Sequence, residues 1–170
     1  YREFLINPLT NSPYADNSNI TTRGAIWSFL RYAADRRGGS ESTTWFQLAN
    51  APAGSHGIQN LTRVLGTDLA SLMRDWGVAN YTDDFIATVG SAGTHPSWDF
   101  RSIVAFLSQG NFPLATLPMD SVSITSVGIS DGSSAYLRFG VKPGAVGGGR
   151  ITSRGAAVPS GFSLSILRTK

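Results

Sequence analysis

The hydrophobic period of this chain changes once, and the change limits the folds that the chain can adopt. Within residues 22–76, apolar side chains recur at the spacing of one helix face, as at Ile26 and Leu30. After Pro118 apolar and polar residues alternate, which is typical of strands with one buried face. The sequence therefore predicts a helical part that is followed by a β part.

Four helices are predicted in the helical part, at residues 22–37, about 42–50, 57–65 and 67–79. Thr21 or Thr22 can cap the first helix, and Asp68 can cap the fourth. Residues 1–20 are rich in Asn, Pro and Ser, and we expect them to be extended.

Two stretches after the fourth helix are ambiguous. Residues 85–89 fit a short strand or a helix tail, and residues 98–104 fit either a strand or a helix.

The β part has a strong turn signal at Asp131-Gly132. Strands are predicted at residues 122–128, 135–141, 150–153 and 162–168, which makes one antiparallel unit of about four strands. The predicted fold class is α+β, with a helical subdomain over residues 1–112 and a small, β-sandwich-like antiparallel domain over residues 113–170. Because a domain of about 50 residues buries only a marginal core, we expect it to pack against the helices.

Composition excludes several classes of function. The chain of 170 residues has no Cys, which excludes a disulfide scaffold, a thiol nucleophile and a cysteine zinc site. Its net charge of +3 comes from scattered basic residues, of which only Arg36 and Arg37 are adjacent. A nucleic-acid interface needs a cluster or a stripe, so no nucleic-acid partner is expected. No run approaches the roughly 20 apolar residues of a membrane-spanning helix.

His56 is the one candidate catalytic residue that the sequence offers. It lies in a loop that leads into a predicted helix, where it would assist a site built elsewhere. The alternative, a solvated or capping loop histidine, fits the local pattern better. His95, in a Gly- and Ser-rich loop, has the same two interpretations. Neither histidine has a second histidine at helical spacing, so no metal site is predicted.

For the paired acids, the triple glycine and the tryptophans, a structural role fits the sequence better than a functional one. Asp83-Asp84 lacks the further oxygen ligands of a calcium site, and we expect a solvated helix exit. Gly147-Gly148-Gly149 opens no helix, so it fits a flexible hairpin loop better than a phosphate-binding loop. The tryptophans fit a sugar-stacking platform, but core anchors are the more common role. They are Trp27, Trp45, Trp76 and Trp98.

Two phrases in the helical part carry a resemblance to a known family. They are RGAIWSFLRYAADR at residues 23–36 and GTDLASLMRDW at residues 66–76. Residues 20 to about 104 resemble the region after the zinc site in gluzincin-type metallopeptidases, especially the secreted bacterial hyicolysin-like group. In related aminopeptidases a Tyr that stabilises the oxyanion lies three residues before the Gly that matches Gly24, and this chain has Thr21 there.

This resemblance implies that the zinc ligands lie before residue 1, so that zinc belongs to the parent protein and no cofactor belongs to this chain. The chain would be the non-catalytic C-terminal portion of a secreted bacterial metallopeptidase-like protein, extracellular or in the cell envelope. Its partners would be the upstream catalytic portion and a peptide substrate. Its helices would wall the substrate cleft, and its β unit would stabilise or attach the parent protein. The alternative is a free-standing extracellular binding or adhesion module that uses exposed aromatic residues or the β domain.

Overall fold

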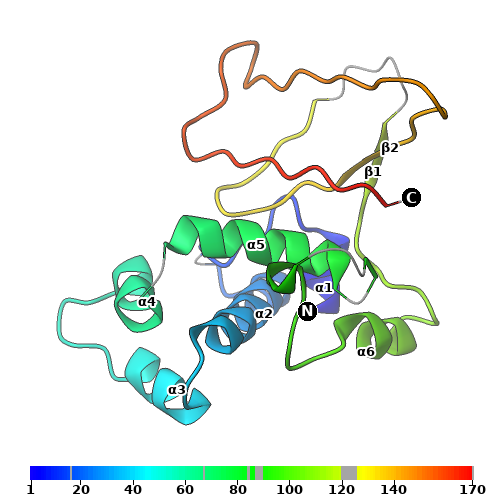
Figure 1. Cartoon of the computed structure of the whole chain (residues 1–170). Coiled ribbons are helices and arrows are strands. Elements are labelled where there is room, and N and C mark those ends of the chain that lie inside the picture. Colours follow the sequence, from blue (N-terminus) through cyan, green and yellow to red (C-terminus); the bar gives the residue numbers. More distant parts are fainter. Residues whose placement is uncertain (16, 67, 84, 87–89, 120–125, 170) are drawn as a thin grey trace.

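The structure is a computed structural model that describes residues 1–169 except residues 16, 67, 84, 87–89 and 120–125. The helices gather in one part of the molecule, and the C-terminal residues loop over α5 (Figure 1). In chain order the elements are α1 (Arg2–Ile6), α2 (Ile20–Arg37), α3 (Glu41–Ala49), α4 (Gly57–Leu65), α5 (Leu69–Thr82), the short 3₁₀ helix η1 (Ser91–Gly93), α6 (Phe100–Leu107), β1 (Leu117–Met119) and β2 (Leu137–Phe139).

The helices α2 and α5 begin at capping side chains that the sequence supplies. The Asn19 side-chain oxygen accepts the backbone N–H of Thr22 at 2.7 Å, which makes α2 slightly longer than predicted from a cap at Thr21 or Thr22. Asp68 caps α5 as predicted and accepts two backbone N–H groups at 3.1 and 3.3 Å. These bonds satisfy donors that the first turn of a helix cannot satisfy itself.

Local signals also determine α4 and α6. Helix α4 covers the predicted residues 57–65, and Gly66 ends it with a φ of 65°, a left-handed conformation that glycine adopts without strain. The ambiguous residues 98–104 contribute to α6, because the Asp99 carboxylate accepts the backbone N–H of Ser102 at 2.9 Å and starts a helix there.

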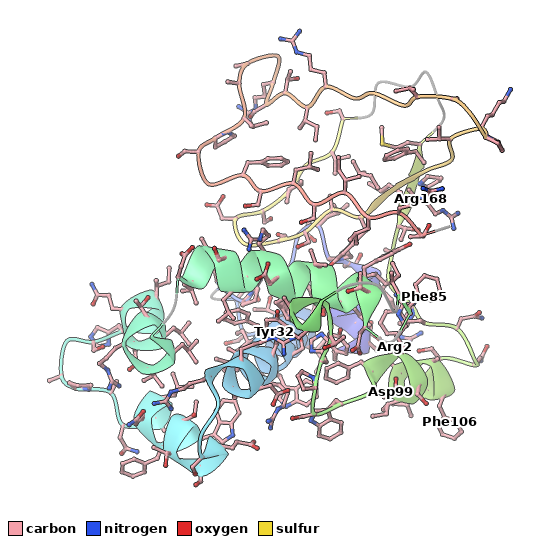
Figure 2. The ribbon with its side chains drawn as sticks, in the orientation of Figure 1. Arg2, Tyr32, Phe85, Asp99, Phe106 and Arg168 are labelled. Carbon is pink, nitrogen blue, oxygen red and sulfur yellow. The ribbon has the colours of Figure 1, made fainter. Side chains whose placement is uncertain are left out.

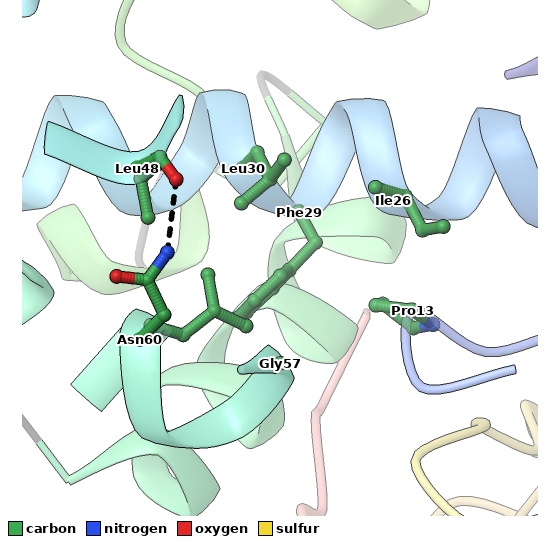
Figure 3. A pocket seen from close by; sticks show the side chains of 8 residues that line it. Pro13, Ile26, Phe29, Leu30, Leu48, Gly57 and Asn60 are labelled. Atoms are coloured by element: carbon green, nitrogen blue, oxygen red, sulfur yellow. Dashed lines mark hydrogen bonds between the residues drawn. The ribbon is translucent and has the colours of Figure 1, made fainter. Parts of the chain in front are cut away.

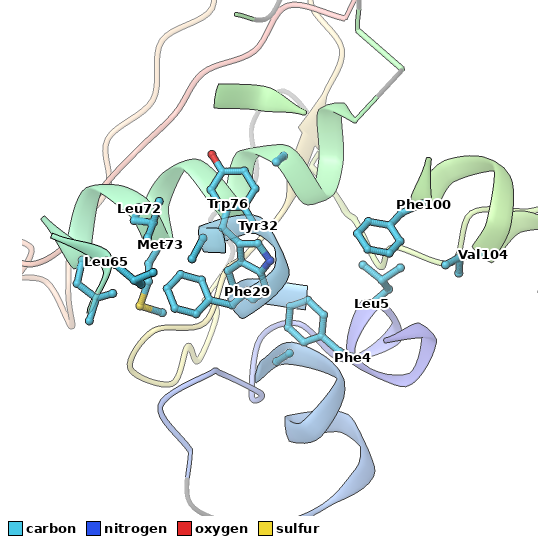
Figure 4. Close-up of a cluster of buried hydrophobic side chains, with 14 residues drawn as sticks. Phe4, Leu5, Phe29, Tyr32, Leu65, Leu72, Met73, Trp76, Phe100 and Val104 are labelled. Carbon is cyan, nitrogen blue, oxygen red and sulfur yellow. The ribbon is translucent and has the colours of Figure 1, made fainter. Parts of the chain in front are cut away.

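One hydrophobic core joins α1, α2, α5 and α6 (Figure 4). Trp76 is 1% exposed, and its ring centre lies 5.3 Å from that of Phe4 and 5.7 Å from that of Phe29. Its indole N–H donates to the Ser28 hydroxyl at 3.3 Å, so the polar group of this buried ring is satisfied. The other members of the core are Leu5, Ala25, Tyr32, Ala33, Leu65, Leu69, Leu72, Met73, Ala79, Phe100 and Val104.

The extended conformation predicted for residues 1–20 is wrong at its start, where α1 forms instead. Phe4 and Leu5 on this helix are 0% exposed. Gly24 of α2 permits the close packing, because a Cβ there would meet the backbone nitrogen of Tyr1 at 2.7 Å. A helix of five residues is too short to be stable alone or to display a full period, so its burial decides its conformation.

The predicted antiparallel β domain over residues 113–170 is wrong. Among the described residues the sheet consists of β1 and β2, which run parallel, with Leu117 opposite Leu137. About 42% of the described residues are helical and 5% are strand, so the described fold is a helical one with a very small sheet.

Of the predicted strands, the one at residues 135–141 forms in part, as β2 (Leu137–Phe139). Strands do not form at residues 150–153 and 162–168, and the strand predicted at 122–128 lies partly outside the described residues. The turn at Asp131-Gly132 is confirmed, with a φ of 72° at the glycine. Alternation describes the two faces of a strand, but a strand also needs a neighbour whose backbone completes its hydrogen bonds.

The chain after α6 is attached to the helical part through backbone groups. The Ala115 N–H donates to the carbonyl of Leu5 at 2.8 Å. The Tyr136 hydroxyl donates to the carbonyl of Gly77 in α5 at 2.8 Å. The domain boundary between residues 112 and 113 stays a prediction.

Candidate functional site

Five polar side chains meet near the C-terminal end of α5, and we call them the buried polar cluster: Tyr1, Asn80, Asp83, Arg101 and Tyr136. They come from the start of the chain, from α5 and its last turn, from α6 and from the residue before β2. No sequence motif connects positions so far apart, so the sequence analysis missed the cluster.

The two tyrosines of the cluster are neutral hydrogen-bond donors. The Tyr1 hydroxyl donates to the Asn80 side-chain oxygen at 2.6 Å. Burial, assisted by the neighbouring Tyr136 and Asp83, raises the pKa of the Tyr1 hydroxyl well above 10. Burial also raises the pKa of Tyr136 to about 12, against a smaller effect of its hydrogen bonds. Neither phenol ionises near neutral pH, so neither can act there as a general base.

The Asp83 carboxylate holds the loop that leads into α6. It accepts the backbone N–H of His95 at 2.8 Å and that of Phe100 at 3.3 Å. Asp83 is only 1% exposed, so the solvated helix exit predicted for it is wrong, while Asp84 lies outside the described residues. Hydrogen bonds of this kind are strengthened by the charge of the acceptor. Asp83 therefore has a clear role in positioning the loop.

His95 is buried beside the cluster, contrary to the solvated loop histidine that the sequence favoured. It is 4% exposed, and its ring centre lies 5.4 Å from that of Tyr32 and 4.7 Å from that of Phe100. Within the described part of the chain, neither ring nitrogen has a hydrogen-bond partner. Burial, assisted by Arg36 and opposed by Asp35, lowers the pKa of His95 to about 4. Its imidazole is therefore neutral at physiological pH.

Arg101 connects the cluster to aromatic side chains near the surface. Its guanidinium carbon lies 4.3 Å from the ring centre of Phe112 and 4.5 Å from that of Phe85. A guanidinium N–H of Arg101 donates to the carbonyl of Tyr81. Burial lowers the pKa of Arg101, but a guanidinium stays charged near neutral pH. Cation–π contacts compensate in part for its loss of water.

The chemistry of this cluster is structural. A nucleophile needs a base within about 2.6–3.2 Å, and the tyrosine hydroxyls of the cluster donate to oxygens of an amide and a peptide group instead. The hydroxyl of Tyr32, next to His95, donates to the carbonyl of Ala92 at 2.6 Å. Among the described residues no group of three or more His, Cys, Asp or Glu could hold a metal ion. The cluster joins distant segments of the chain.

His56 lies apart from the buried polar cluster. It precedes α4, at the opposite end of the helical part from α6 (Figure 1), and its exposed side chain makes no capping hydrogen bond. Its catalytic role stays a prediction. Gly147-Gly148-Gly149 lies in an exposed loop, but not in the predicted hairpin, because no strand forms at residues 150–153.

The tryptophans divide between core and surface. Trp76 is a core anchor, as predicted, but Trp27 and Trp98 are 45% and 40% exposed. Their ring centres lie 6.0 Å apart, and Phe100 packs against both rings. These two residues are therefore not fully buried core anchors, because each contacts the core residue Phe100 and also faces solvent.

A second feature of this region is an apolar surface along α6, which we call the α6 apolar face: Trp27, Trp98, Ile103, Phe106 and Leu107. Phe106 is 85% exposed and Leu107 is 68% exposed, and Figure 2 shows Phe106 directed away from the rest of the molecule. The sequence analysis missed this surface because it left residues 98–104 ambiguous between a strand and a helix, and that choice decides which side chains share a face.

A cavity of about 250 Å³ lies between α2, α3 and α4 (Figure 3). Its lining is mainly apolar and includes Ile26, Phe29, Leu30, Leu48 and Leu61. Asn60, at its edge, donates to the carbonyl of Leu48 at 2.9 Å. The cavity has no charged side chain in its lining, so it offers space for an apolar group but no catalytic chemistry.

Comparisons with protein families, with curated proteins and with solved structures found no match for this chain. The resemblance to gluzincin-type metallopeptidases stays a prediction. Within the described residues, no helix is long and apolar enough to cross a membrane.

Proposed function

We propose that this chain is the non-catalytic portion of a secreted bacterial metallopeptidase-like protein and that the α6 apolar face packs against the catalytic portion. The observation that carries the proposal is the distribution of apolar side chains around α6. Phe100 and Val104 are buried in the core of this chain, whereas Phe106 and Leu107 are exposed. The polar residues of α6 are Arg101 and Ser102, so most of its circumference is apolar, and a helix of this kind generally buries most of its surface.

The sequence resemblance favours a partner on the same polypeptide. The first phrase, residues 23–36, lies on α2, and residues 69–76 of the second phrase lie on α5. Phe29 of α2 and Trp76 of α5 pack together in the core. Trp27 belongs to the first phrase and also to the α6 apolar face. In this proposal the helices wall the substrate cleft of a zinc enzyme in the extracellular space or cell envelope. The zinc ligands belong to the upstream portion.

Photocrosslinking in the protein as its gene encodes it tests this packing. A benzoylphenylalanine at the position of Phe106 should crosslink to a segment that precedes residue 1. The same group at the position of Ile58, which is 52% exposed on α4, is the matched control and should not. Chelator-sensitive peptidase activity is expected for the longer protein and not for residues 1–170 alone. Equal crosslinking from both positions, or a gene without a His-Glu-x-x-His segment before residue 1, would overturn the proposal.

The second candidate function is a free-standing extracellular adhesion module. The exposed pair Trp27 and Trp98 favours it, because tryptophan is enriched at the energetic centres of binding surfaces. Binding of residues 1–170 to a glycan array should then be lost in Trp98→Ala and retained in Trp45→Ala. An adhesion surface on the predicted antiparallel β domain is contradicted, because the described residues do not form that domain.

A further inference from the structure

Charge is divided unevenly along this chain. Residues 137–169, which we call the C-terminal segment, contain no Asp or Glu. Their basic residues are Arg138, Lys142, Arg150, Arg154 and Arg168, and all five are exposed. Residues 1–136 contain all eleven acidic residues of the protein and eight of its Lys and Arg. The modest net charge of +3 therefore hides a net negative helical part and a strongly positive segment.

The C-terminal segment also exposes apolar side chains between its basic residues. Val146 is 99% exposed and Ile166 is 78% exposed, while Leu164 and Phe139 are each 58% exposed. Figure 1 shows the segment, in orange and red, looping beyond α5 and away from α3 and α6. A segment that exposes both apolar groups and cations can bind a surface that offers both hydrocarbon and negative charge.

We infer that the C-terminal segment binds the surface of an anionic phospholipid bilayer. Its Arg and Lys side chains contact headgroup phosphates, and side chains such as Val146 and Ile166 enter the boundary between headgroups and acyl chains. A nucleic acid would satisfy the same charges, but it would leave the exposed aliphatic side chains in water. For stacking on bases the segment offers only Phe139 and Phe162. The combination of charge and aliphatic exposure therefore favours lipid.

Vesicle cosedimentation of residues 1–170 tests the inference. Vesicles that contain phosphatidylglycerol in phosphatidylcholine should bind the protein, and vesicles of phosphatidylcholine alone should bind it much more weakly. Each basic residue near such a surface raises the partition coefficient by roughly fivefold. The triple variant Arg138→Gln, Lys142→Gln and Arg150→Gln should therefore lose about 100-fold in partitioning.

A triple variant in the helical part provides the matched control. Arg23→Gln, Arg63→Gln and Arg74→Gln remove the same charge from exposed positions on α2, α4 and α5. They should change partitioning little, because these residues lie outside the C-terminal segment that contacts the bilayer in this inference.

The apolar contribution needs its own pair of variants. Val146→Ser with Ile166→Ser should weaken binding to anionic vesicles. The control, Phe46→Ser with Ile58→Ser, removes exposed apolar groups from α3 and α4 and should not. Circular dichroism should be the same for all these variants because none of the altered residues lies in the core.

Three results would overturn the inference. One is equal binding to neutral and anionic vesicles. Another is an equal loss of binding in the segment variants and in their controls. The third is binding to a DNA duplex without binding to anionic vesicles, which would assign the segment to nucleic acid.

Discussion

The Tyr1 hydroxyl donates a 2.6 Å hydrogen bond to the side-chain oxygen of Asn80, which lies 79 positions further along the chain. The ring of Tyr1 also lies 4.7 Å from that of Phe100 and 6.4 Å from that of Trp27, measured between ring centres. One side chain thus contacts α2, α5 and α6. Tyr1 therefore helps to hold α2, α5 and α6 together.

Tyr1→Phe should destabilise the protein. The variant keeps the ring and its packing but leaves the Asn80 oxygen without its donor, and an unsatisfied buried acceptor costs about 1–3 kcal/mol. Urea unfolding measures this loss. Tyr14→Phe, at a residue that is 37% exposed, is the control and should change the free energy of unfolding by less than about 0.5 kcal/mol. Equal stability of Tyr1→Phe and the natural protein would contradict the importance of this bond.

Gly77→Ala should also destabilise, although alanine favours helices. A Cβ at position 77 would lie 2.8 Å from the Ser134 hydroxyl oxygen, so the contact between α5 and the chain before β2 must shift. We expect the overpacking cost of about 1–3 kcal/mol to exceed the gain in helix propensity of up to about 1 kcal/mol.

A double variant provides the control for this steric explanation. Ser134→Ala removes the hydroxyl, and the next atom, the Ser134 Cβ, lies 3.8 Å from the added Cβ, which is ordinary contact. The double variant should therefore be more stable than Gly77→Ala in a double-mutant cycle of urea unfolding. A stabilising effect of Gly77→Ala alone would show that the two segments do not pack as described.

Replacement of two phenylalanines of α6 should change the free energy of unfolding by very different amounts. Phe100→Ala should cost about 3–5 kcal/mol because its ring is buried in the core, at 2% exposure. Phe106→Ser should cost less than about 0.5 kcal/mol in residues 1–170, because its ring is exposed. In the longer protein, Phe106→Ser should reduce stability as well. Thermal unfolding of both forms gives the comparison, and an unchanged longer protein would contradict packing on the α6 apolar face.

Stability should fall as the pH is lowered from 6.5 to about 4, because the folded state depresses the pKa of His95 across this range. Above pH 6.5, the ordinary value, the histidine is neutral in both states and the full stability is present. Below it the unfolded chain takes up a proton that the folded chain does not. The total loss is roughly 3 kcal/mol, and it is complete once the pH has passed the folded pKa.

Urea unfolding at the two ends of this pH range checks the contribution of His95. His95→Leu should reduce the pH dependence, because it removes the group that titrates differently in the two states. His56→Leu, at the exposed histidine, should keep it. Parallel pH profiles for the natural protein and His95→Leu would refute the assignment to His95.

Limited trypsin digestion should cut first after Arg150 or Arg154, in the exposed C-terminal segment. Arg101 should resist cleavage, because it lies in α6 and its guanidinium is bonded to the Tyr81 carbonyl. The large fragment should retain its helical circular dichroism. Mass spectrometry identifies the order of cuts, and early cleavage inside α2 would mean that the helices are not the stable core.

The buried polar cluster could not have been predicted from the sequence. The sequence indicated a solvated Asp83 at a helix exit and a His95 in a Gly- and Ser-rich loop. Their burial arises from contacts with Tyr32, Phe100 and neighbouring backbone groups, which belong to other segments. A helical or alternating pattern reports only on neighbours along the chain.

The sequence by itself determined where the main helices begin and end, as the Asp68 cap and the left-handed Gly66 show. It could do so because caps, glycines and apolar periods act within one or two turns. Only the tertiary structure decided that residues 2–6 form a helix and that Leu117–Met119 and Leu137–Phe139 form a short parallel pair in place of the predicted antiparallel domain. A five-residue helix and a single strand are not stable alone. Their conformations depend on burial and hydrogen bonds supplied by residues far away in the sequence.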